Sequence, residues 1–226
     1  MIDIIYSYYN QYNTLSTQVQ LLNSYSKETK NTVNLIYVDD NSTQTAKQYL
    51  EKLKLTYSLY YITENVGWNN GGAKNLGIYN SKSDWKVVLD IDMFLTDNLL
   101  QEIFLYPKKE NCIYKFLTNK IESTNPTIHK TYPGALMIHK NAVEKIGYFD
   151  EDFCGNYGCE DKAYFAKARH YNFKTVKLRT ENKLIFLDGL PRKKSPEPIN
   201  VKLFDSKNKN KEWSTDTLRF KWKKII

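Results

Sequence analysis

Apolar residues in the first hundred positions follow two patterns that alternate along the chain. Runs of mostly apolar residues are typical of buried strands, and such runs occupy residues 2–7, 33–40, 57–62 and 85–92. Between them, apolar residues recur at helical spacing, as Leu15, Val19 and Leu22 and then as Ala46, Leu50 and Leu53. Residues 73–80 read as a further helix. Strands that alternate with helices predict an α/β fold with a mostly parallel central sheet.

The second half of the chain carries the same two signals over shorter stretches. Helices are predicted over residues 99–106, from Asn141 to a stop at Gly147, and over 160–170. Strands are predicted over residues 135–139, 173–178 and 183–187. We therefore expect one compact domain over residues 1–190, followed by an extension over residues 191–226.

The net charge of the chain is concentrated in this extension. The whole sequence holds 33 Lys and Arg against 25 Asp and Glu, a formal net charge of +8. Residues 1–190 contribute only +1, and residues 191–226 contribute +7. Prolines and weak periodicity predict an extended strap or linker over 191–213, whereas strict alternation over 218–223 predicts a strand. Basic and aromatic residues together also suit an anionic surface, so the extension either closes over the domain or docks it peripherally on a membrane.

Composition excludes several classes of protein. A hydrophobic fraction of 41% rules out disorder along the whole chain, and no apolar run approaches the roughly 18 residues that a membrane span requires. Three cysteines cannot close a disulfide framework, and the N-terminus lacks the features of a signal peptide. We therefore expect a cytoplasmic protein.

The strand at 85–92 ends in two carboxylates, Asp90 and Asp92. Two acids in this spacing at a strand end can hold a hard divalent cation and leave positions open for phosphate oxygens. The simpler reading is a pair of solvated acids in a loop. A phosphatase with an Asp-x-Asp-x-[Thr/Val] motif is disfavoured, because Phe94 stands where Thr or Val is needed.

A second strand, at 33–40, also ends in two acids. Asp39 could accept the imide N–H of uracil or thymine, or a ribose hydroxyl. Alternatively, residues 40–42 only cap a helix that begins near Thr43. Ligands of parallel sheets bind beyond the carboxyl ends of the strands, so Asp39, Asp40, Asp90 and Asp92 are expected at one site.

Two further segments carry candidate chemistry. The glycine-rich residues 65–77 allow close backbone approach, and Lys74 there places a cation beside an anion site. Glu160 and Asp161 begin a helix, where one of them, desolvated against Tyr157, could act as a general base. The alternative is that both acids only favour the helix dipole. The three histidines are treated as structural, and no second cysteine pair completes a zinc site with Cys154 and Cys159.

Together and in this order, these motifs resemble those of the GT-A nucleotide-sugar glycosyltransferases of the family-2-like group. The segments that carry the resemblance are residues 4–11 (IIYSYYNQ), 38–42 (VDDNS), 65–78 (NVGWNNGGAKNLGI), 88–92 (VLDID) and 132–164. The last of these looks like the galactosyltransferase C-terminal module of β-1,4-galactosyltransferases and polypeptide GalNAc-transferases. The resemblance covers about residues 1–170 and fades afterwards.

The resemblance implies a single Rossmann-like GT-A domain that transfers a sugar, with inversion and metal dependence, from a nucleoside-diphosphate sugar to a hydroxyl of a glycan or glycoconjugate. It implies roles for these residues: Tyr8, Asn10, Asp39, Asp40, Lys74 and Asp90 for the nucleotide; Asp92 and Asp90 for Mn²⁺ or Mg²⁺; Trp68, Gly134, Tyr157 and Gly158 for the donor or acceptor sugar. Glu160 would bind sugar hydroxyls and Asp161 would be the catalytic base. The galactosyltransferase-like members supply a downstream histidine to the metal. No histidine follows His170 here, and Asp188 is the substitute we consider.

UDP is favoured over GDP because one carboxylate at Asp39 suits an imide N–H, although thymidine nucleotides satisfy the same argument. Two other functions are kept as alternatives. One is a nucleic-acid or anionic-surface binding protein that acts through the basic extension, although the nearly neutral body argues against nucleic acid as a partner. The other is a catalytically inactive protein that binds a sugar nucleotide.

Overall fold

The computed structural model describes residues 1–118, 130–187 and 195–226. The strands are β1 (Ile2–Tyr8), β2 (Val33–Asp39), β3 (Tyr57–Ile62), β4 (Trp85–Asp90), β5 (Met93–Phe94), β6 (Cys112–Thr118), β7 (Lys130–His139), β8 (Lys174–Leu178), β9 (Ile185–Phe186) and β10 (Trp222–Lys224). The helices are α1 (Tyr12–Asn23), α2 (Lys27–Thr32), α3 (Lys47–Leu50), α4 (Asn70–Asn80), α5 (Asp97–Leu105), α6 (Lys140–Ile146), α7 (Glu160–His170) and α8 (Pro198–Asn210), with a 3₁₀ turn η1 (Glu151–Phe153).

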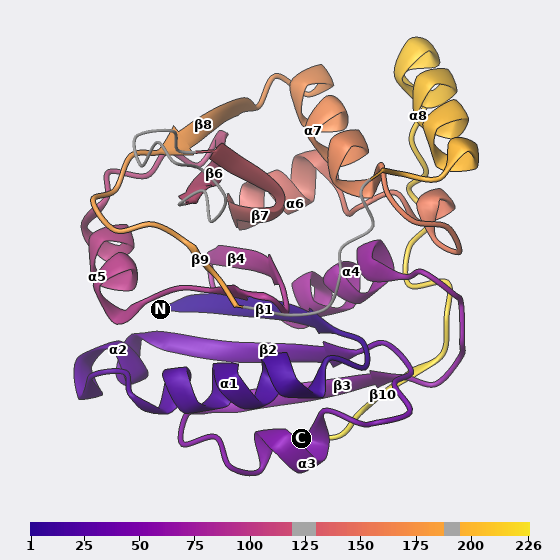
Figure 1. Cartoon of the computed structure of the whole chain (residues 1–226). Coiled ribbons are helices and arrows are strands. Elements are labelled where there is room, and N and C mark those ends of the chain that lie inside the picture. Colours follow the sequence, from indigo (N-terminus) through magenta and orange to yellow (C-terminus); the bar gives the residue numbers. More distant parts are fainter. Residues whose placement is uncertain (119–129, 188–194) are drawn as a thin grey trace.

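The central sheet brings the carboxyl ends of its first strands to one edge. Its strand order is β10-β3-β2-β1-β4-β7-β6-β8 (Figure 1). The pairs β3–β2, β2–β1 and β1–β4 are parallel, as is β6–β8, whereas β7 and β10 run antiparallel to their neighbours. Tyr8 lies opposite Asp39, and Ser7 lies opposite Asp90. The predicted α/β fold with a mostly parallel sheet is confirmed, and the two acidic strand ends flank β1.

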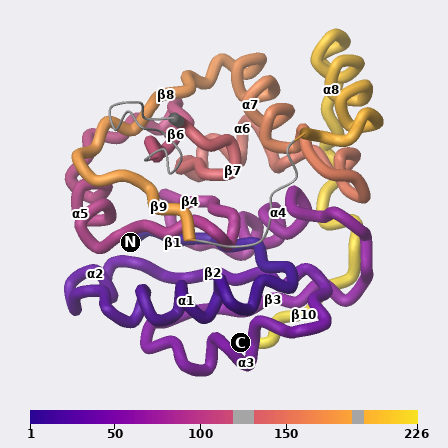
Figure 2. The backbone as a smooth tube through the Cα atoms, viewed as in Figure 1, coloured from indigo at the N-terminus to yellow at the C-terminus, as the bar shows by residue number. Residues whose placement is uncertain are grey.

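The C-terminal extension is built into the fold. Figure 2 shows it, in yellow, passing from α8 to the β3 edge of the sheet. The linker predicted over 191–213 is wrong for Pro198–Asn210, which form α8. Pro198 suits the first turn of a helix, where its missing N–H costs nothing. The strand predicted over 218–223 is present as the shorter β10, which begins four residues later, ends one residue later and pairs antiparallel with β3.

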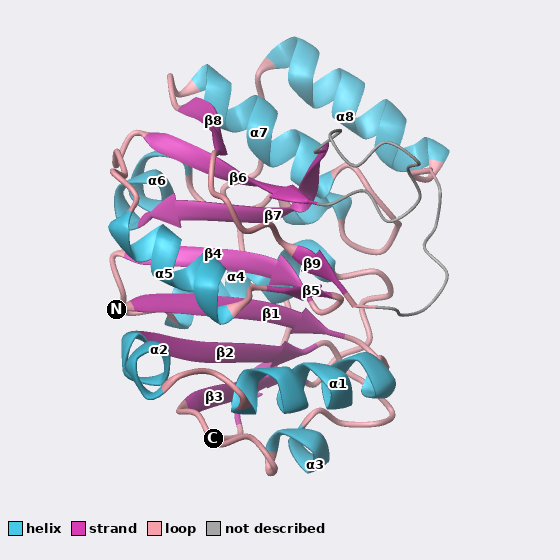
Figure 3. Ribbon diagram, turned by 60° about the vertical axis from the view of Figure 1, so that its left-hand side comes forward, coloured by secondary structure: helices cyan, strands magenta, loops and turns pink. Residues whose placement is uncertain are grey.

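Helices cover both faces of the sheet. Alternate residues of each strand point to opposite faces, so Ile4 and Tyr6 pack with α1, α3 and α5, while Ile5 packs with α4, α6 and α7. Figure 3 shows α1 and α5 in front of the sheet and α4 behind it. Because most of its strands are buried on both faces, they read as continuous apolar runs in the sequence.

Several boundaries differ from those that the sequence predicts. α3 spans only Lys47–Leu50 although the apolar spacing continues to Leu53. α6 begins at Lys140 rather than Asn141, because the His139 side chain accepts a hydrogen bond from the backbone N–H of Asn141. Gly147 ends α6 as predicted, with a φ of 80°. In the part of the chain that is described, no helix is both long enough and apolar enough to cross a membrane.

Candidate active site

A cavity of about 760 Å³ opens beyond the carboxyl ends of β1, β2 and β4. Nine of the residues selected from the sequence line it: Tyr8, Trp68, Asp40, Asp90, Asp92, Tyr157, Gly158, Glu160 and Asp161. The structure therefore brings most of the predicted site together from segments spread over more than half of the chain. Asn10, Asp39, Lys74 and Gly134 lie outside this lining. Asp188 lies outside the described residues.

Asp90 lies at the end of β4, where a glycine on the adjacent strand leaves room for its carboxylate. A Cβ added at Gly134 would lie 2.2 Å from Asp90 Oδ2. The carboxylate is also held from α4, because Asn70 Nδ2 donates to Asp90 Oδ1 at 3.1 Å. Ser7 Oγ in turn donates to Asn70 Oδ1 at 2.6 Å. Gly134 thus acts on the cavity through Asp90 rather than by lining it.

Lys74 is fully buried and joins two acids of the site. Its Nζ lies 2.9 Å from Asp90 Oδ1 and 3.0 Å from Asp161 Oδ1. Burial alone would lower the pKa of the Lys74 ammonium, but the charges of Asp161 and Asp90 outweigh burial and raise that pKa above its ordinary value. Lys74 is therefore a fixed cation that links α4, β4 and α7 directly behind the cavity.

Glu160 and Asp161 occupy the first turn of α7 and line the same cavity. Burial, together with the charges of Glu160 and Asp90, raises the pKa of the Asp161 carboxyl to about 7 against the opposing charge of Lys74. Glu160 is buried and accepts a hydrogen bond from Trp68 Nε1 at 3.2 Å. A carboxylate with a pKa near neutrality can both accept and release a proton, which is what a general base requires.

The two acids that end β2 have different surroundings. Both oxygens of Asp39 accept backbone hydrogen bonds, from Ser42 at 2.9 Å and from Ala46 at 2.8 Å. The capping expected of residues 40–42 is not seen, because the next helix, α3, begins only at Lys47 and its N-cap, Ala46, has no side-chain capping bond. Asp40 faces the cavity and accepts from Asn69 Nδ2 at 3.2 Å, and burial raises its pKa to about 7. Of the two, Asp40 is the acid that a ligand in the cavity would meet.

Tyr8 and Asn10 brace the turn that follows β1. The Tyr8 hydroxyl donates to the backbone oxygen of Gln44 at 2.8 Å. Asn10 has a φ of 48° and its Oδ1 accepts from Thr43 Oγ1 at 3.0 Å and from the backbone N–H of Gln44 at 3.2 Å. These contacts fix the shape of the cavity at the end of β1. Of these two residues, Tyr8 lines the cavity and Asn10 does not.

An aromatic pair forms another wall. The rings of Trp68 and Tyr157 meet edge to face, with centroids 4.7 Å apart. The backbone N–H of Gly155 donates to the Trp68 oxygen at 2.7 Å and joins the two loops. Trp68 keeps 37% of its surface exposed. Exposed aromatic faces of this kind suit the apolar faces of sugar rings.

The cavity residues that the sequence does not indicate include Ser195, Pro196 and Glu197, which come from the extension. Pro196 lies against Gly158, where an added Cβ would come within 2.6 Å of Pro196 Cβ. Gly158 also has a φ of 93°, a conformation that favours glycine. No sequence signal indicates this contact, because prolines are common in linker-like segments whether or not they pack on another loop.

Asp90 and Asp92 suit a divalent cation. Both line the cavity and both offer hard oxygen ligands, and the absence of a side chain at Gly134 keeps Asp90 at the cavity wall. Within residues 1–118, 130–187 and 195–226, no group of three or more His, Cys, Asp or Glu side chains is arranged to hold a metal ion by itself. The residues present fit a cation that is held by these two protein carboxylates and, at its other coordination positions, by oxygen atoms of a bound ligand.

Comparison with known proteins shows the family and the fold of the chain. The profile of a family described as "Glycosyl transferase family 2" matches residues 3–175. No curated protein sequence matches the chain. Among solved structures, S. aureus TarS 1–349 is similar at 15% identity with a TM-score of 0.62, over 82% of this chain and 60% of that one.

Two further solved structures are similar. The mannosyltransferase PcManGT from Pyrobaculum calidifontis, in complex with GDP-Man and Mn²⁺, has 12% identity and a TM-score of 0.63, over 85% of this chain and 58% of that one. A Drosophila β-1,4-galactosyltransferase 7 with manganese, UDP-Gal and xylobiose has 13% identity and a TM-score of 0.51, over 83% of this chain and 70% of that one. This chain thus spans only about three fifths of the first two.

Proposed function

Because the chain belongs to glycosyl transferase family 2 and has the GT-A fold, we propose that its cavity transfers a sugar from a nucleoside-diphosphate sugar to a hydroxyl group of a glycan or glycoconjugate. The observation that carries the proposal is that one cavity is lined both by an acidic strand end, Asp90 and Asp92, and by the partly buried carboxyl of Asp161, whose pKa is raised to about 7. The first can hold a cation on a diphosphate, and the second can accept a proton.

The nucleotide would lie along the ends of β1 and β2. Asp40 is the carboxylate available there, and a single acceptor suits the imide N–H of uracil or thymine. We therefore favour a UDP-sugar, with thymidine nucleotides as the next choice. Asp92 and Asp90 would hold Mn²⁺ or Mg²⁺, which neutralises charge on the leaving diphosphate.

The acceptor hydroxyl would react next to Asp161. Its oxygen forms a bond to the anomeric carbon, the bond from that carbon to the diphosphate oxygen breaks with its electron pair, and the hydroxyl proton passes to Asp161. A single displacement of this kind inverts the anomeric centre. Lys74 keeps the Asp161 carboxylate in place and compensates its charge, so the base stays fixed within a buried cluster.

A panel of donors tests the reaction directly. The protein is incubated with UDP-, dTDP- and GDP-sugars and Mn²⁺, and hydrolysis without an acceptor is measured. We expect slow, metal-dependent hydrolysis of at least one UDP-sugar. Asp161→Asn should abolish this turnover and leave nucleotide binding nearly intact, since Asp161 acts on the nucleophile. Full turnover by Asp161→Asn would exclude Asp161 as the base.

Thermal stabilisation by UDP separates this function from the alternatives. We expect UDP to raise the melting temperature only with a divalent cation, and Asp92→Ala to remove that shift. The exposed Asp205→Ala on α8 is the matched control and should keep it. A protein that binds phosphate backbones would instead bind in a strongly salt-dependent way, regardless of Asp92. An inactive sugar-nucleotide binder would show the thermal shift without turnover.

A further inference from the structure

The C-terminal extension contributes to the cavity although it lies beyond the residues that match the family. The match ends at residue 175, whereas Ser195, Pro196 and Glu197 line the cavity. The part of the extension that is described therefore supplies a wall that the family resemblance does not account for. What this wall does has to be argued from its own contacts.

The extension is hydrogen-bonded to the turn that carries Tyr157. The backbone N–H of Glu197 donates to the Tyr157 oxygen at 2.9 Å, and the backbone N–H of Tyr157 donates to Glu197 Oε1 at 3.2 Å. Pro196 packs on Gly158 directly beside these two bonds. Tyr157 is thus fixed on one side by Glu197 and on the other by its ring contact with Trp68.

One buried side chain on α8, that of Asn200, is hydrogen-bonded to several backbone carbonyls of the loop of residues 153–158. Asn200 is 1% exposed, and the two N–H groups of its Nδ2 are shared among three backbone oxygens, those of Phe153 at 3.0 Å, Asn156 at 2.9 Å and Gly158 at 2.8 Å. An amide group that binds three carbonyls of one irregular loop defines the path of that loop. Replacing it would leave buried carbonyl groups without a donor, which is energetically costly.

The position of this loop determines where the acids of α7 lie. Gly158 is followed by Cys159, whose φ of 73° turns the chain into α7, and by Glu160 and Asp161. Only two residues separate Gly158, whose oxygen Asn200 binds, from Asp161. A shift of the loop would therefore move both Tyr157 and Asp161 relative to the strand ends that carry Asp90 and Asp92.

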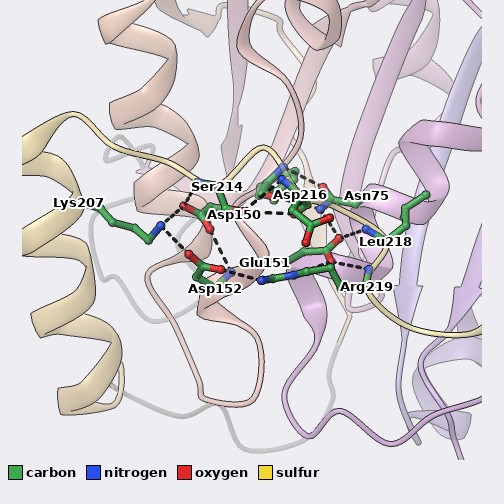
Figure 4. Close-up of polar contacts among 10 residues, drawn as sticks. Asn75, Asp150, Glu151, Asp152, Lys207, Ser214, Asp216, Leu218 and Arg219 are labelled. Carbon is green, nitrogen blue, oxygen red and sulfur yellow. Dashed lines mark hydrogen bonds and ion pairs between the residues drawn. The ribbon is translucent and has the colours of Figure 1, made fainter.

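The extension is itself fastened to the run of acids Asp150, Glu151 and Asp152 (Figure 4). Lys207 Nζ lies 2.9 Å from Asp150 Oδ2 and 2.7 Å from Asp152 Oδ2, and Arg219 Nη1 lies 2.8 Å from Asp152 Oδ1. Glu151 is 3% exposed and accepts the backbone N–H of Leu218 at 2.8 Å. These contacts hold α8 at its C-terminal end, so that Asn200 has a fixed support.

We propose that Asn200 is a positioning residue that sets the 153–158 loop, and through it Tyr157 and Asp161, on the acceptor side of the cavity. This inference rests on the proposed function. The acceptor side is assigned to this wall because Asp161, the proposed base, must lie next to the acceptor hydroxyl that it deprotonates. Asp161 belongs to the side of the nucleophile.

The test compares Asn200→Ala with Asn210→Ala, an exposed position on the same helix. Hydrolysis of the preferred UDP-sugar with Mn²⁺ is measured, because water then takes the place of the acceptor at Asp161. For Asn200→Ala we expect kcat to fall about ten-fold or more, since small misplacements of a catalytic group are costly. The donor KM and the UDP-induced thermal shift should stay within about two-fold of the wild type, because the strand ends are untouched. Asn210→Ala should behave as the wild type.

A second pair of variants keeps the inference testable if Asn200→Ala does not fold. Glu197→Ala removes the side-chain acceptor for the Tyr157 N–H, whereas Glu197→Gln retains an acceptor oxygen. We expect Glu197→Ala to lower kcat without changing the donor KM, and Glu197→Gln to restore most of the activity.

Two results would overturn the inference while the proposed function stands: unchanged kcat in Asn200→Ala and Glu197→Ala, or an equal loss of kcat and of UDP binding. A wild-type protein that binds and turns over no nucleotide sugar would instead overturn the proposed function, and this inference with it. The wild-type measurement therefore distinguishes the two failures.

Discussion

Lys74 shows at the scale of single residues why the site could be predicted only in part. The sequence predicts a cation beside an anion site, and the structure places the Lys74 ammonium between two carboxylates of the protein, Asp90 and Asp161. Asp161 is 87 positions away from Lys74 along the chain. Residue types and local spacing indicate which groups carry charge, but such a distant pairing depends on how α4 and α7 pack.

The pKa of Asp161 predicts how turnover depends on pH. Burial raises it to about 7, so the ionised base becomes the main form as the pH rises through neutrality. We expect kcat for donor hydrolysis to rise between about pH 6 and 8 and then to level. Glu160→Gln removes a like charge that raises the Asp161 pKa, so the midpoint should move to lower pH. A profile without a limb near neutrality would contradict the role of Asp161.

Asp40 predicts a pH dependence of stability. Burial raises its pKa from 3.8 to about 7, so between these values the folded state keeps a proton that the unfolded chain has released. The free energy of unfolding therefore falls as pH rises through this interval. Asp40→Asn keeps an acceptor for Asn69 and lacks the charge. We expect its stability relative to the wild type to increase from pH 4 to pH 7 in urea titrations, and a constant difference would contradict the assigned shift.

Gly134 predicts an effect on metal binding from a residue outside the cavity lining. Gly134→Ala would place a Cβ 2.2 Å from Asp90 Oδ2 and force that carboxylate to move. The divalent-dependent stabilisation by UDP should be lost or greatly weakened in a thermal-shift assay. Gly71→Ala is the control, because its Cβ would meet only ordinary contacts, the nearest at 3.6 Å. An intact UDP shift in Gly134→Ala would show that Asp90 tolerates displacement.

At the scale of secondary-structure elements, the sequence predicts correctly those strands and helices whose buried residues form a clear apolar pattern. β1, β2 and β4 are buried on both faces and appear as apolar runs, and α7 was predicted with its observed bounds. α8 was missed because it buries only Asn200 and Phe204, so its outer face dominates the sequence. α3 ends at Leu50 although Leu53 is also buried in the core, so apolar residues at helical spacing do not by themselves mark where a short helix ends.

α4 links the nucleotide side of the cavity to the segment before α7, through a buried amide. Asn75 Nδ2 donates to the Phe149 oxygen at 2.9 Å and to Glu151 Oε1 at 2.8 Å, and its Oδ1 accepts the Phe149 N–H at 2.8 Å. Asn75→Ala should lower the free energy of unfolding by about 3 kcal/mol, because it leaves several buried polar groups unpaired. Asn80→Ala, which removes one half-buried bond to Leu76, should cost less than about 1 kcal/mol. Equal effects in urea titrations would contradict this linking role.

At the scale of the whole molecule, the structure shows that basic residues of the extension form ion pairs with the domain. Lys207 and Arg219 pair with the acids of residues 150–152, and Lys221 pairs with Glu64 at 3.3 Å. Part of the +7 charge is thus used to attach the extension to the nearly neutral body. No contact in the described residues supports the membrane docking considered for it, and the described residues give the extension a cavity wall, a helix and an edge strand.

The edge strand leads to a prediction about solubility. β10 covers the outer edge of β3, with Trp222 opposite Ile62, and the Ile225 N–H donates to the Leu59 oxygen at 2.8 Å. A chain truncated after Phe220 would expose the unpaired backbone of a strand rich in tyrosine, and such edges template association between molecules. We expect the truncated protein to aggregate at concentrations where the full chain scatters little light.

The truncation also removes three lysines, so a control must separate the loss of charge from the loss of pairing. Replacing Lys221, Lys223 and Lys224 with glutamine removes the same charge and keeps the backbone bonds of β10. If edge protection is the cause, this variant should remain monomeric in light scattering while the truncated chain aggregates. If both aggregate alike, the lysines act through charge repulsion and β10 is not what protects the sheet.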